Sequence, residues 1–266
     1  MAEVDRLAVE HYRIGLMQMM ENAGRELARL ARAQFLGGDA RRKRVAVLVG
    51  KGGNGGGALV AARHLHNWGA CVEVTLAQRA REMNPIPRRQ LAIVQRMGVA
   101  IRGSNPSGAL GRPDLVLDGI IGYRLAGAPT GNVADLIRWA NAARAPILAL
   151  DLPSGLDATT GAAFDPAIRA AATLTLALPK TGLRPARAAG YVGELYLADI
   201  GIPPVVYERP ELGFEIGALF ARGEVLRLAQ KKKKSVQASD GLTPAHDADS
   251  AARPNVRRRS IVAKPR

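Results

Sequence analysis

The chain has 266 residues, of which 47% are hydrophobic, and it carries a formal net charge of +15 at pH 7. This length allows one sizeable core in one or two domains, and the single cysteine excludes an intramolecular disulfide. The acidic start of the chain and the absence of a span-length apolar run exclude a secretory signal and a membrane helix, so we expect a soluble cytoplasmic protein.

Helical and strand-like patterns alternate from residue 1 to about residue 228. This alternation predicts an α/β fold with a mostly parallel sheet and helices on both faces. Cys71 opens one apolar run with no basic neighbour, so we expect it to be a small buried strand residue rather than a nucleophile. The predicted helices cover residues 2–12, 16–35, 58–69, 87–98 and 132–143. The predicted strands cover residues 45–49, 72–76, 115–117, 147–150, 173–178 and 194–198.

Six glycines lie within residues 50–57, directly after the first predicted strand. The segment GKGGNG, which starts at Gly50, fits the dinucleotide fingerprint G-x-G-x-x-G. In that motif an acidic residue lies at the end of the next strand, but this chain has Gln78 and Arg79 there. Because Arg79 would suit a 2′-phosphate, an NADP-dependent oxidoreductase remains an alternative. A phosphate-binding loop of the Walker type is excluded, because no GK[ST] sequence closes the glycine run. The glycine run is then either a structural turn or a backbone cradle for another phosphate-bearing ligand.

Polar residues follow four of the predicted strands, at the end where ligands bind in an open α/β sheet. Each of these residue types alone is more often a helix cap or a turn residue. A parallel sheet, however, would bring all of them to one rim beside the glycines, so we predict the functional site there. The residues are Asn54, Asp118, Asp151, Ser154 and Lys180.

The end of the chain differs in composition from the rest. Residues 231–266 carry a net charge of +7 and no aromatic residue. We therefore expect a folded domain over residues 1–228 and a basic disordered tail over residues 229–266. Such a tail either acts as a solubilising extension or makes weak, salt-dependent contacts with nucleic acid or anionic surfaces.

Several segments resemble the NAD(P)H-hydrate epimerase family, also called the YjeF N-terminal domain, in order and spacing. They are LMQMMENAGRELA, VLVGKGGNGGGALVAARHLHNWGA, DLVLDGIIGYRLAGAPTG, ILALDLPSGLDATTG, ALPKTGL and GELYLADIGIP. The similarity covers about residues 3–205, and LDLPSGLDATTG is its most specific part. It implies a Rossmann-like three-layer α/β/α sandwich that is usually dimeric. It also implies an enzyme that interconverts the R and S forms of hydrated NADH and NADPH, with a bound potassium ion. The dehydratase domain of some members is not expected here.

The resemblance assigns roles residue by residue. Asn54, Asp118 and Ser154 match the potassium ligands, and oxygen ligands from three strand ends suit a hard cation. Asp151 matches the substrate-contacting acid and is our candidate acid/base, because inverting the hydrated carbon requires a proton to be given and returned. Lys180 is the second catalytic candidate, as a partner of Asp151 or of the pyrophosphate. The residues that match the substrate-binding loops are Gly53, Asn54, Gly55, Gly56, Gly57, Gly122, Tyr123, Arg124, Leu125, Ala126, Gly127 and Ala128, together with Asp151.

The chain departs from the family pattern at two places. The family loop G-x-G-N-N-G-G-D-G reads GKGGNGGGA here, so Gly53 replaces an asparagine, Gly57 the aspartate and Ala58 the last glycine. The family's GTG reads GYR at residues 122–124. Losing an acid and gaining a base favours an anionic ligand. Because the glycine loop differs from the family pattern, a non-catalytic nucleotide- or protein-binding module on the same fold is a second alternative.

Overall fold

The computed structural model describes residues 1–103 and 112–229. The strands of this part of the chain are β1 (Arg44–Val49), β2 (Cys71–Leu76), β3 (Ala100–Arg102), β4 (Leu115–Gly119), β5 (Ile147–Leu150), β6 (Ala172–Leu176), β7 (Glu194–Ala198) and β8 (Val225–Leu228). They form one eight-stranded sheet in the order β3-β2-β1-β4-β5-β6-β7-β8. All neighbouring strands are parallel except β7 and β8. The predicted α/β fold with a mostly parallel sheet is confirmed.

Helices connect most of these strands. They are α1 (Ala2–Arg6), α2 (Leu16–Leu30), α3 (Gly53–Asn67), α4 (Pro85–Arg96), α5 (Gly131–Ala142), α6 (Ala189–Val192) and α7 (Pro204–Tyr207). Single π-helical turns, Leu7–His11 and Ala31–Phe35, extend α1 and α2. None of the helices in the described ranges is long and apolar enough to cross a membrane.

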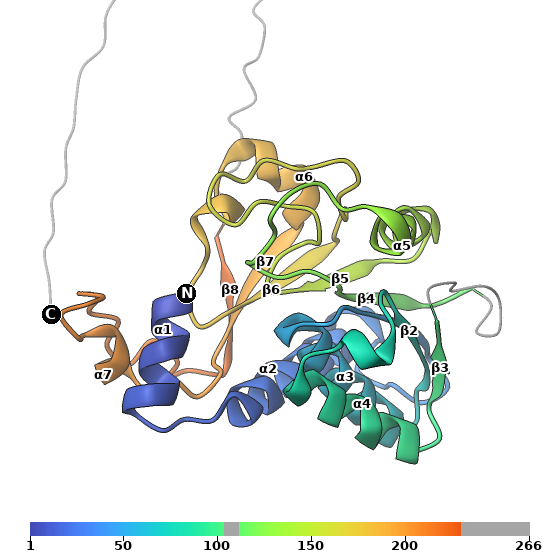
Figure 1. Cartoon of the computed structure of the whole chain (residues 1–266), viewed down its shortest axis with the longest axis horizontal. Coiled ribbons are helices and arrows are strands. Elements are labelled where there is room, and N and C mark those ends of the chain that lie inside the picture. The colour runs from blue at the N-terminus through green and yellow to red at the C-terminus, as the bar shows by residue number, and fades with distance from the viewer. Residues whose placement is uncertain (104–111, 230–266) are drawn as a thin grey trace, which may run out of the picture. The chain divides into compact units, whose positions relative to one another are not determined.

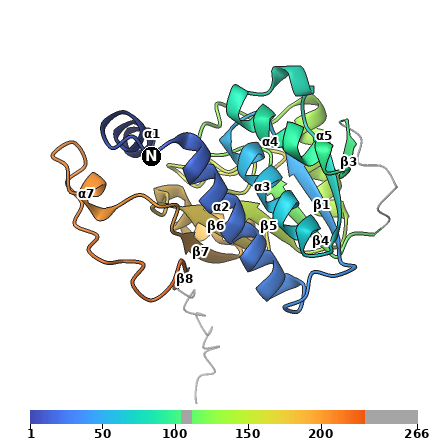
Figure 2. The same ribbon diagram turned by 90° about the horizontal axis from the view of Figure 1, so that it is seen from below.

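The two faces of the sheet are covered by different helices, as Figures 1 and 2 show for α2, α3 and α4 on one side and α5 on the other. Successive side chains of a strand point to opposite faces. In β1, Val45, Val47 and Val49 accordingly join the core beneath α2, α3 and α4. Ala46 and Leu48 join the core beneath α5. Burial on both faces explains why this strand is a continuous apolar run rather than an alternating one.

The glycine run is helical, which differs from the predicted start of this helix at residue 58. Helix α3 begins at Gly53, although each interior glycine costs about 1 kcal/mol in helix propensity. Packing against α2 explains the difference. A Cβ on Gly24 of α2 would lie 2.4 Å from the carbonyl oxygen of Gly57, and one on Gly56 would lie 2.4 Å from the sulfur of Met20. The glycines therefore allow α2 and α3 to cross in close contact.

Four other details differ from the sequence-based predictions. Strand β4 continues through Asp118, and β6 ends at Leu176 because Ala177 adopts a positive φ of 62°. Cys71 is exposed rather than buried, since it is the first residue of β2. The short edge strands β3 and β8 were not predicted. From residue 230 onward the predicted tail lies outside the described residues, and the domain boundary stays a prediction.

Candidate active site

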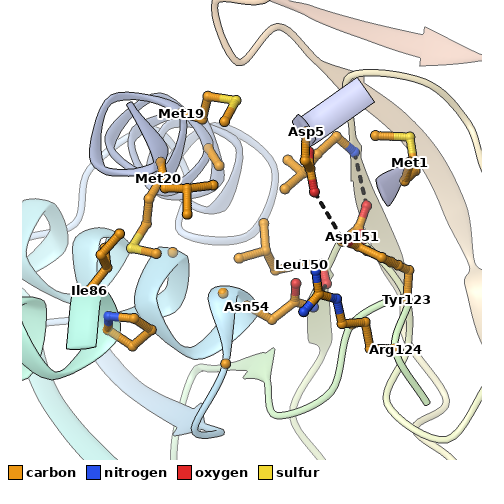
Figure 3. A pocket seen from close by; sticks show the side chains of 18 of the residues that line it. Met1, Asp5, Met19, Met20, Asn54, Ile86, Tyr123, Arg124, Leu150 and Asp151 are labelled. Atoms are coloured by element: carbon orange, nitrogen blue, oxygen red, sulfur yellow. Dashed lines mark hydrogen bonds between the residues drawn. The ribbon is translucent and has the colours of Figure 1, made fainter. Parts of the chain in front are cut away.

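A cavity of about 530 Å³ lies at the carboxyl ends of β1, β4, β5 and β6. Figure 3 shows its two sides, an apolar one with Met20 and Ile86 from α2 and α4, and a polar one that includes Asn54 and Asp151. Lys180 also lines this cavity. Most of the wall is apolar with a few converging polar groups, which is the usual composition of a small-molecule site. The cavity therefore lies at the rim that the strand-end residues predicted.

Asp118 and Ser154 are buried next to the cavity, whose lining includes neither of them. The carboxylate of Asp118 in β4 is fully buried. Its Oδ1 accepts a hydrogen bond from Ser154 Oγ at 2.6 Å, and its Oδ2 accepts one from the Ser154 backbone N–H at 2.8 Å. Burial raises the pKa of Asp118 to about 6, against the lowering effect of these hydrogen bonds. Within the described residues, no cationic side chain is among the groups that act on this carboxylate.

Asn54 ties the start of α3 to two other strand ends. Its side-chain Nδ2 donates to the carbonyl oxygen of Leu150 at 2.7 Å and to that of Ile121 at 3.2 Å. The Ile121 N–H in turn donates to Ser154 Oγ at 2.9 Å. A Cβ on Gly122 would lie 2.6 Å from the Oδ1 of Asn54, so a larger residue at position 122 would displace this amide. The structure thus brings the three predicted cation ligands into one hydrogen-bonded cluster.

The donor set of this cluster fits a hard cation of low charge. It offers one buried carboxylate without a countercharge, one hydroxyl and one amide, all oxygen donors. The described part of the chain holds no group of three or more His, Cys, Asp or Glu side chains that could bind a metal ion. Multidentate transition-metal sites of that kind are therefore not present among these residues.

Asp151 follows β5 in a strained backbone conformation. Its φ is +66°, and the N–H of Leu152 donates to the carbonyl of Leu150 at 2.8 Å, which closes a tight three-residue turn. A positive φ is uncommon for any residue other than glycine, and a three-residue turn with a φ near +75° is rare and strained. Such strain persists when the surrounding structure enforces it and is common at functional sites. The turn directs the carboxylate toward Lys180, which comes from the segment after β6.

The carboxylate of Asp151 is anchored through one oxygen. Its Oδ1 accepts hydrogen bonds from Lys180 Nζ, from the Leu176 N–H at 3.3 Å and from Thr175 Oγ1 at 3.4 Å. Lys180 Nζ also donates to the Leu176 carbonyl at 2.9 Å. Both charged side chains are buried. Among the described residues, none donates to Asp151 Oδ2, so that oxygen is available to a ligand in the cavity.

Tyr123 and Arg124, which differ from the family's GTG pattern at residues 122–124, both lie at the cavity wall. The hydroxyl of Tyr123 donates to Asp5 Oδ2 at 2.9 Å, and the Arg124 guanidinium lies 5.5 Å from the centroid of the Tyr123 ring. Asp5 is on α1, and no sequence motif indicated it, because its helix has an ordinary amphipathic pattern. Its partner lies 118 residues away. No local pattern could have revealed this contact.

The remaining loop residues divide into two groups. Gly52, Gly53 and Gly57 line the cavity, and no atom lies within 4 Å of a Cβ built on Gly52 or Gly53. Gly55, in contrast, packs against the backbone, since its Cβ would lie 1.9 Å from the Gly50 carbonyl oxygen. The residues predicted to bind substrate that do not line this cavity are Gly55, Gly56, Leu125, Ala126, Gly127 and Ala128.

Comparisons with known proteins agree with this architecture. The family model described as "YjeF-related protein N-terminus" matches residues 16–182. The chain belongs to this family. The matched range includes every residue of the Asp118 cluster and the Asp151–Lys180 pair, whereas Asp5 lies outside it. The resemblance stated from the sequence is confirmed.

Two single-domain members of the YjeF-related family are among the similar proteins. An NAD(P)H-hydrate epimerase of Dehalogenimonas lykanthroporepellens is 46% identical over 88% of this chain and 92% of its own length. An NAD(P)H-hydrate epimerase of Rhodopirellula baltica is 34% identical over 76% of this chain and 82% of its own length.

Longer members and a solved structure are also similar to the chain. The bifunctional NAD(P)H-hydrate repair enzyme Nnr of Moorella thermoacetica is 42% identical over 76% of this chain, which spans 39% of that enzyme. The crystal structure of yeast ynu0, YNL200c, has a TM-score of 0.71 and 24% identity over 85% of this chain and 96% of that one. This last similarity supports the fold alone.

Proposed function

We propose that this protein is an NAD(P)H-hydrate epimerase that interconverts the R and S forms of hydrated NADH and NADPH. The observation that carries the proposal is the buried Asp151–Lys180 pair at the wall of the strand-end cavity. It is supported by 46% identity to an epimerase along nearly the whole length of that protein. A non-catalytic binding module would not need a buried ion pair with one carboxylate oxygen left without a protein donor.

The geometry accounts for the proton transfers that epimerisation needs. The hydroxyl of the hydrate is on the carbon beside the ring nitrogen, and inversion passes through a planar carbon or an opened ring. Asp151 Oδ2 is the group that takes up or returns the proton, because Oδ1 is already held by Lys180, Leu176 and Thr175. The strained turn at Asp151 fixes the direction of the carboxylate before the substrate binds.

The start of α3 supplies a place for the phosphates of the dinucleotide. This helix has 15 residues, and its first N–H groups are unpaired within the helix. Gly52 and Gly53 leave open space in front of that end. A phosphate is attracted there by backbone N–H groups and by the helix dipole. Arg124, which also lines the cavity, adds a positive charge that the family pattern lacks at this position.

Potassium is the cation proposed for the Asp118 cluster. Asn54, Asp118 and Ser154 would hold it, and its charge would neutralise the buried carboxylate. In a thermal-shift measurement, potassium should raise the melting temperature more than a bulky organic cation at equal ionic strength. Asp118→Asn should remove this difference. Equal melting temperatures in the two salts for the unmodified protein would exclude potassium from the site.

The oxidoreductase alternative loses its structural basis. Arg79, the residue that suggested NADP, does not line the Asp151 cavity but lines a different one at the ends of β2 and β3.

The proposed homodimer rests on the family resemblance, and light scattering at several protein concentrations would test it. A monomer at all concentrations would contradict it.

The deciding experiment follows the R/S ratio of hydrated NADH by chromatography after enzyme is added. The unmodified protein should bring an enriched epimer to equilibrium, and Asp151→Asn should slow this by at least about 100-fold. Asp135→Asn is the matched control, because Asp135 is an exposed residue of α5 that pairs with Arg138 on the same helix. An unmodified protein that binds the hydrate without exchanging the epimers would favour the binding-module alternative.

A further inference from the structure

A second carboxyl group faces the cavity that Asp151 lines. Asp5 on α1 is half-buried and belongs to the same cavity wall as Asp151, Lys180 and Tyr123. Figure 3 shows Asp5 approaching from α1 while Asp151 approaches from the end of β5. Asp5 lies near the start of the chain and Asp151 near its middle. Neither the Asp118 cluster nor the ion pair of Lys180 uses Asp5.

Asp5 is anchored in the same manner as Asp151, through one oxygen only. Its Oδ2 accepts the hydrogen bond of the Tyr123 hydroxyl at 2.9 Å. In the described part of the chain, no side chain or backbone N–H donates to its Oδ1. Two carboxyl groups therefore line one cavity, and each is held by one oxygen and keeps the other for a ligand. Fixed orientation with a free oxygen is what a proton-transfer group needs.

The surroundings of the two carboxyl groups differ in charge. Burial raises the pKa of Asp5, while the hydrogen bond from Tyr123 and the positive charges of Lys180 and the terminal amine act in the opposite direction, and Asp151 adds a smaller upward contribution. Arg124 acts on the neighbouring Tyr123 hydroxyl. Asp151, in contrast, is in direct contact with the Lys180 ammonium. Two carboxyl groups in such different environments are the usual basis for separate acid and base roles.

We propose that Asp5 is a second catalytic residue, the general acid that works with Asp151 as general base. The inference rests on the proposed epimerase function and deepens it. Asp5 Oδ1 gives its proton to the leaving hydroxyl, the C–O bond breaks with both electrons on oxygen, and water departs. The lone pair of the ring nitrogen forms a C=N bond to the planar carbon. Water then adds to the other face, re-forming the C–O bond and returning the electron pair to nitrogen, and its proton passes to Asp151 Oδ2. Proton exchange of the two carboxyl groups with water then returns Asp5 to its protonated form and Asp151 to its ionised form. The reverse sequence converts the other epimer.

Asp5→Asn and Tyr123→Phe separate a catalytic role from a structural one. Asparagine still accepts the hydrogen bond of Tyr123 but cannot donate a carboxylic proton. We expect Asp5→Asn to lower kcat for epimerisation by about 100-fold or more, with KM changed by less than about threefold. Glu3→Gln is the matched control, since Glu3 is on the same helix in an exposed pair with Arg6, and it should leave both constants unchanged.

Tyr123→Phe adds a readout that a structural role would not change. The Tyr123 hydrogen bond lowers the pKa of Asp5, so its loss should move the high-pH limb of the kcat profile to higher pH. If Asp5 only anchored α1, Tyr123→Phe would be the damaging change and Asp5→Asn would be harmless. An Asp5→Asn enzyme with kcat within about threefold of the unmodified enzyme would overturn the inference but not the epimerase function. An unmodified enzyme without exchange activity would overturn both.

Discussion

The ion pair between Lys180 and Asp151 predicts a specific double-mutant result. Their side chains are only 5% and 4% exposed, so each charge depends on the other for stabilisation. Lys180→Met removes the ammonium and keeps an unbranched side chain of similar length. Asp151→Asn removes the carboxylate and keeps a residue that tolerates the φ of +66° at this position. The backbone strain is therefore the same in every variant.

Removing one partner of a buried ion pair typically costs about 3–5 kcal/mol, because the other charge stays buried without its partner. We expect Lys180→Met to lower the free energy of unfolding by this amount, which corresponds to a decrease of roughly 6–20 °C in Tm for a domain of this size. Asp151→Asn should cost less, since the Lys180 ammonium keeps its hydrogen bond to the Leu176 carbonyl. The double variant should be more stable than the sum of the two losses predicts, by about 2–3 kcal/mol.

Urea unfolding followed by circular dichroism measures these free energies, provided that all four proteins show the same m-value. Additive losses in the double variant would refute the reasoning, because they would mean that the two side chains do not stabilise each other. A Lys180→Met variant as stable as the unmodified protein would refute it as well. Each single variant should also lose epimerase activity, whatever its stability.

The remaining predictions concern the glycine departures, Asp5 and the tail. Gly53→Asn, which restores the family residue, should change the free energy of unfolding by less than about 1 kcal/mol, because its Cβ meets no atom within 4 Å. Gly57→Asp should destabilise by about 1–3 kcal/mol, since its Cβ would lie 2.7 Å from Leu150 Cδ2, and this penalty should shrink in a Leu150→Ala background. Urea unfolding of the unmodified protein, the three single variants and the Gly57→Asp/Leu150→Ala double variant tests both statements. Because the folded-state pKa of Asp5 is raised, its ionisation opposes folding as the pH rises above its unfolded-state value of about 4. Asp5→Asn should therefore raise Tm at pH 7 relative to the unmodified protein, and a difference that did not shrink toward pH 4 would contradict this sign. Truncation after Gln230 should leave Tm and epimerase activity nearly unchanged, and a large loss of either would show that the basic tail contributes to the fold.

The strand-end site could be predicted because it depends on few physical rules. Apolar runs gave the interior strands, and parallel strands place their carboxyl ends at one edge. That reasoning was enough to group Asp118 with Ser154, which the structure joins by two hydrogen bonds. It was also enough to place Asp151 and Lys180 on the same rim, where they form an ion pair.

Other features depend on contacts that a local pattern does not encode. The sequence could not distinguish glycines that pack against backbone, such as Gly50 and Gly55, from those that face open space, such as Gly53. The difference is set by where α3 crosses its neighbours. The contact of Asp5 with Tyr123 likewise requires α1 to lie near the loop that follows the carboxyl end of β4. Short edge strands such as β8 bury few side chains and show no clear periodicity.

The position of Cys71 has a practical consequence for experiments on this enzyme. It is the chain's sole cysteine, it is exposed, and it pairs in register with Arg44 at the amino-terminal end of the parallel strands. The cavity lies at the opposite, carboxyl-terminal end. A maleimide dye or surface linker would therefore attach at one defined point, without further mutagenesis and away from the cavity. Single-molecule or immobilised assays of the native sequence become possible on that basis.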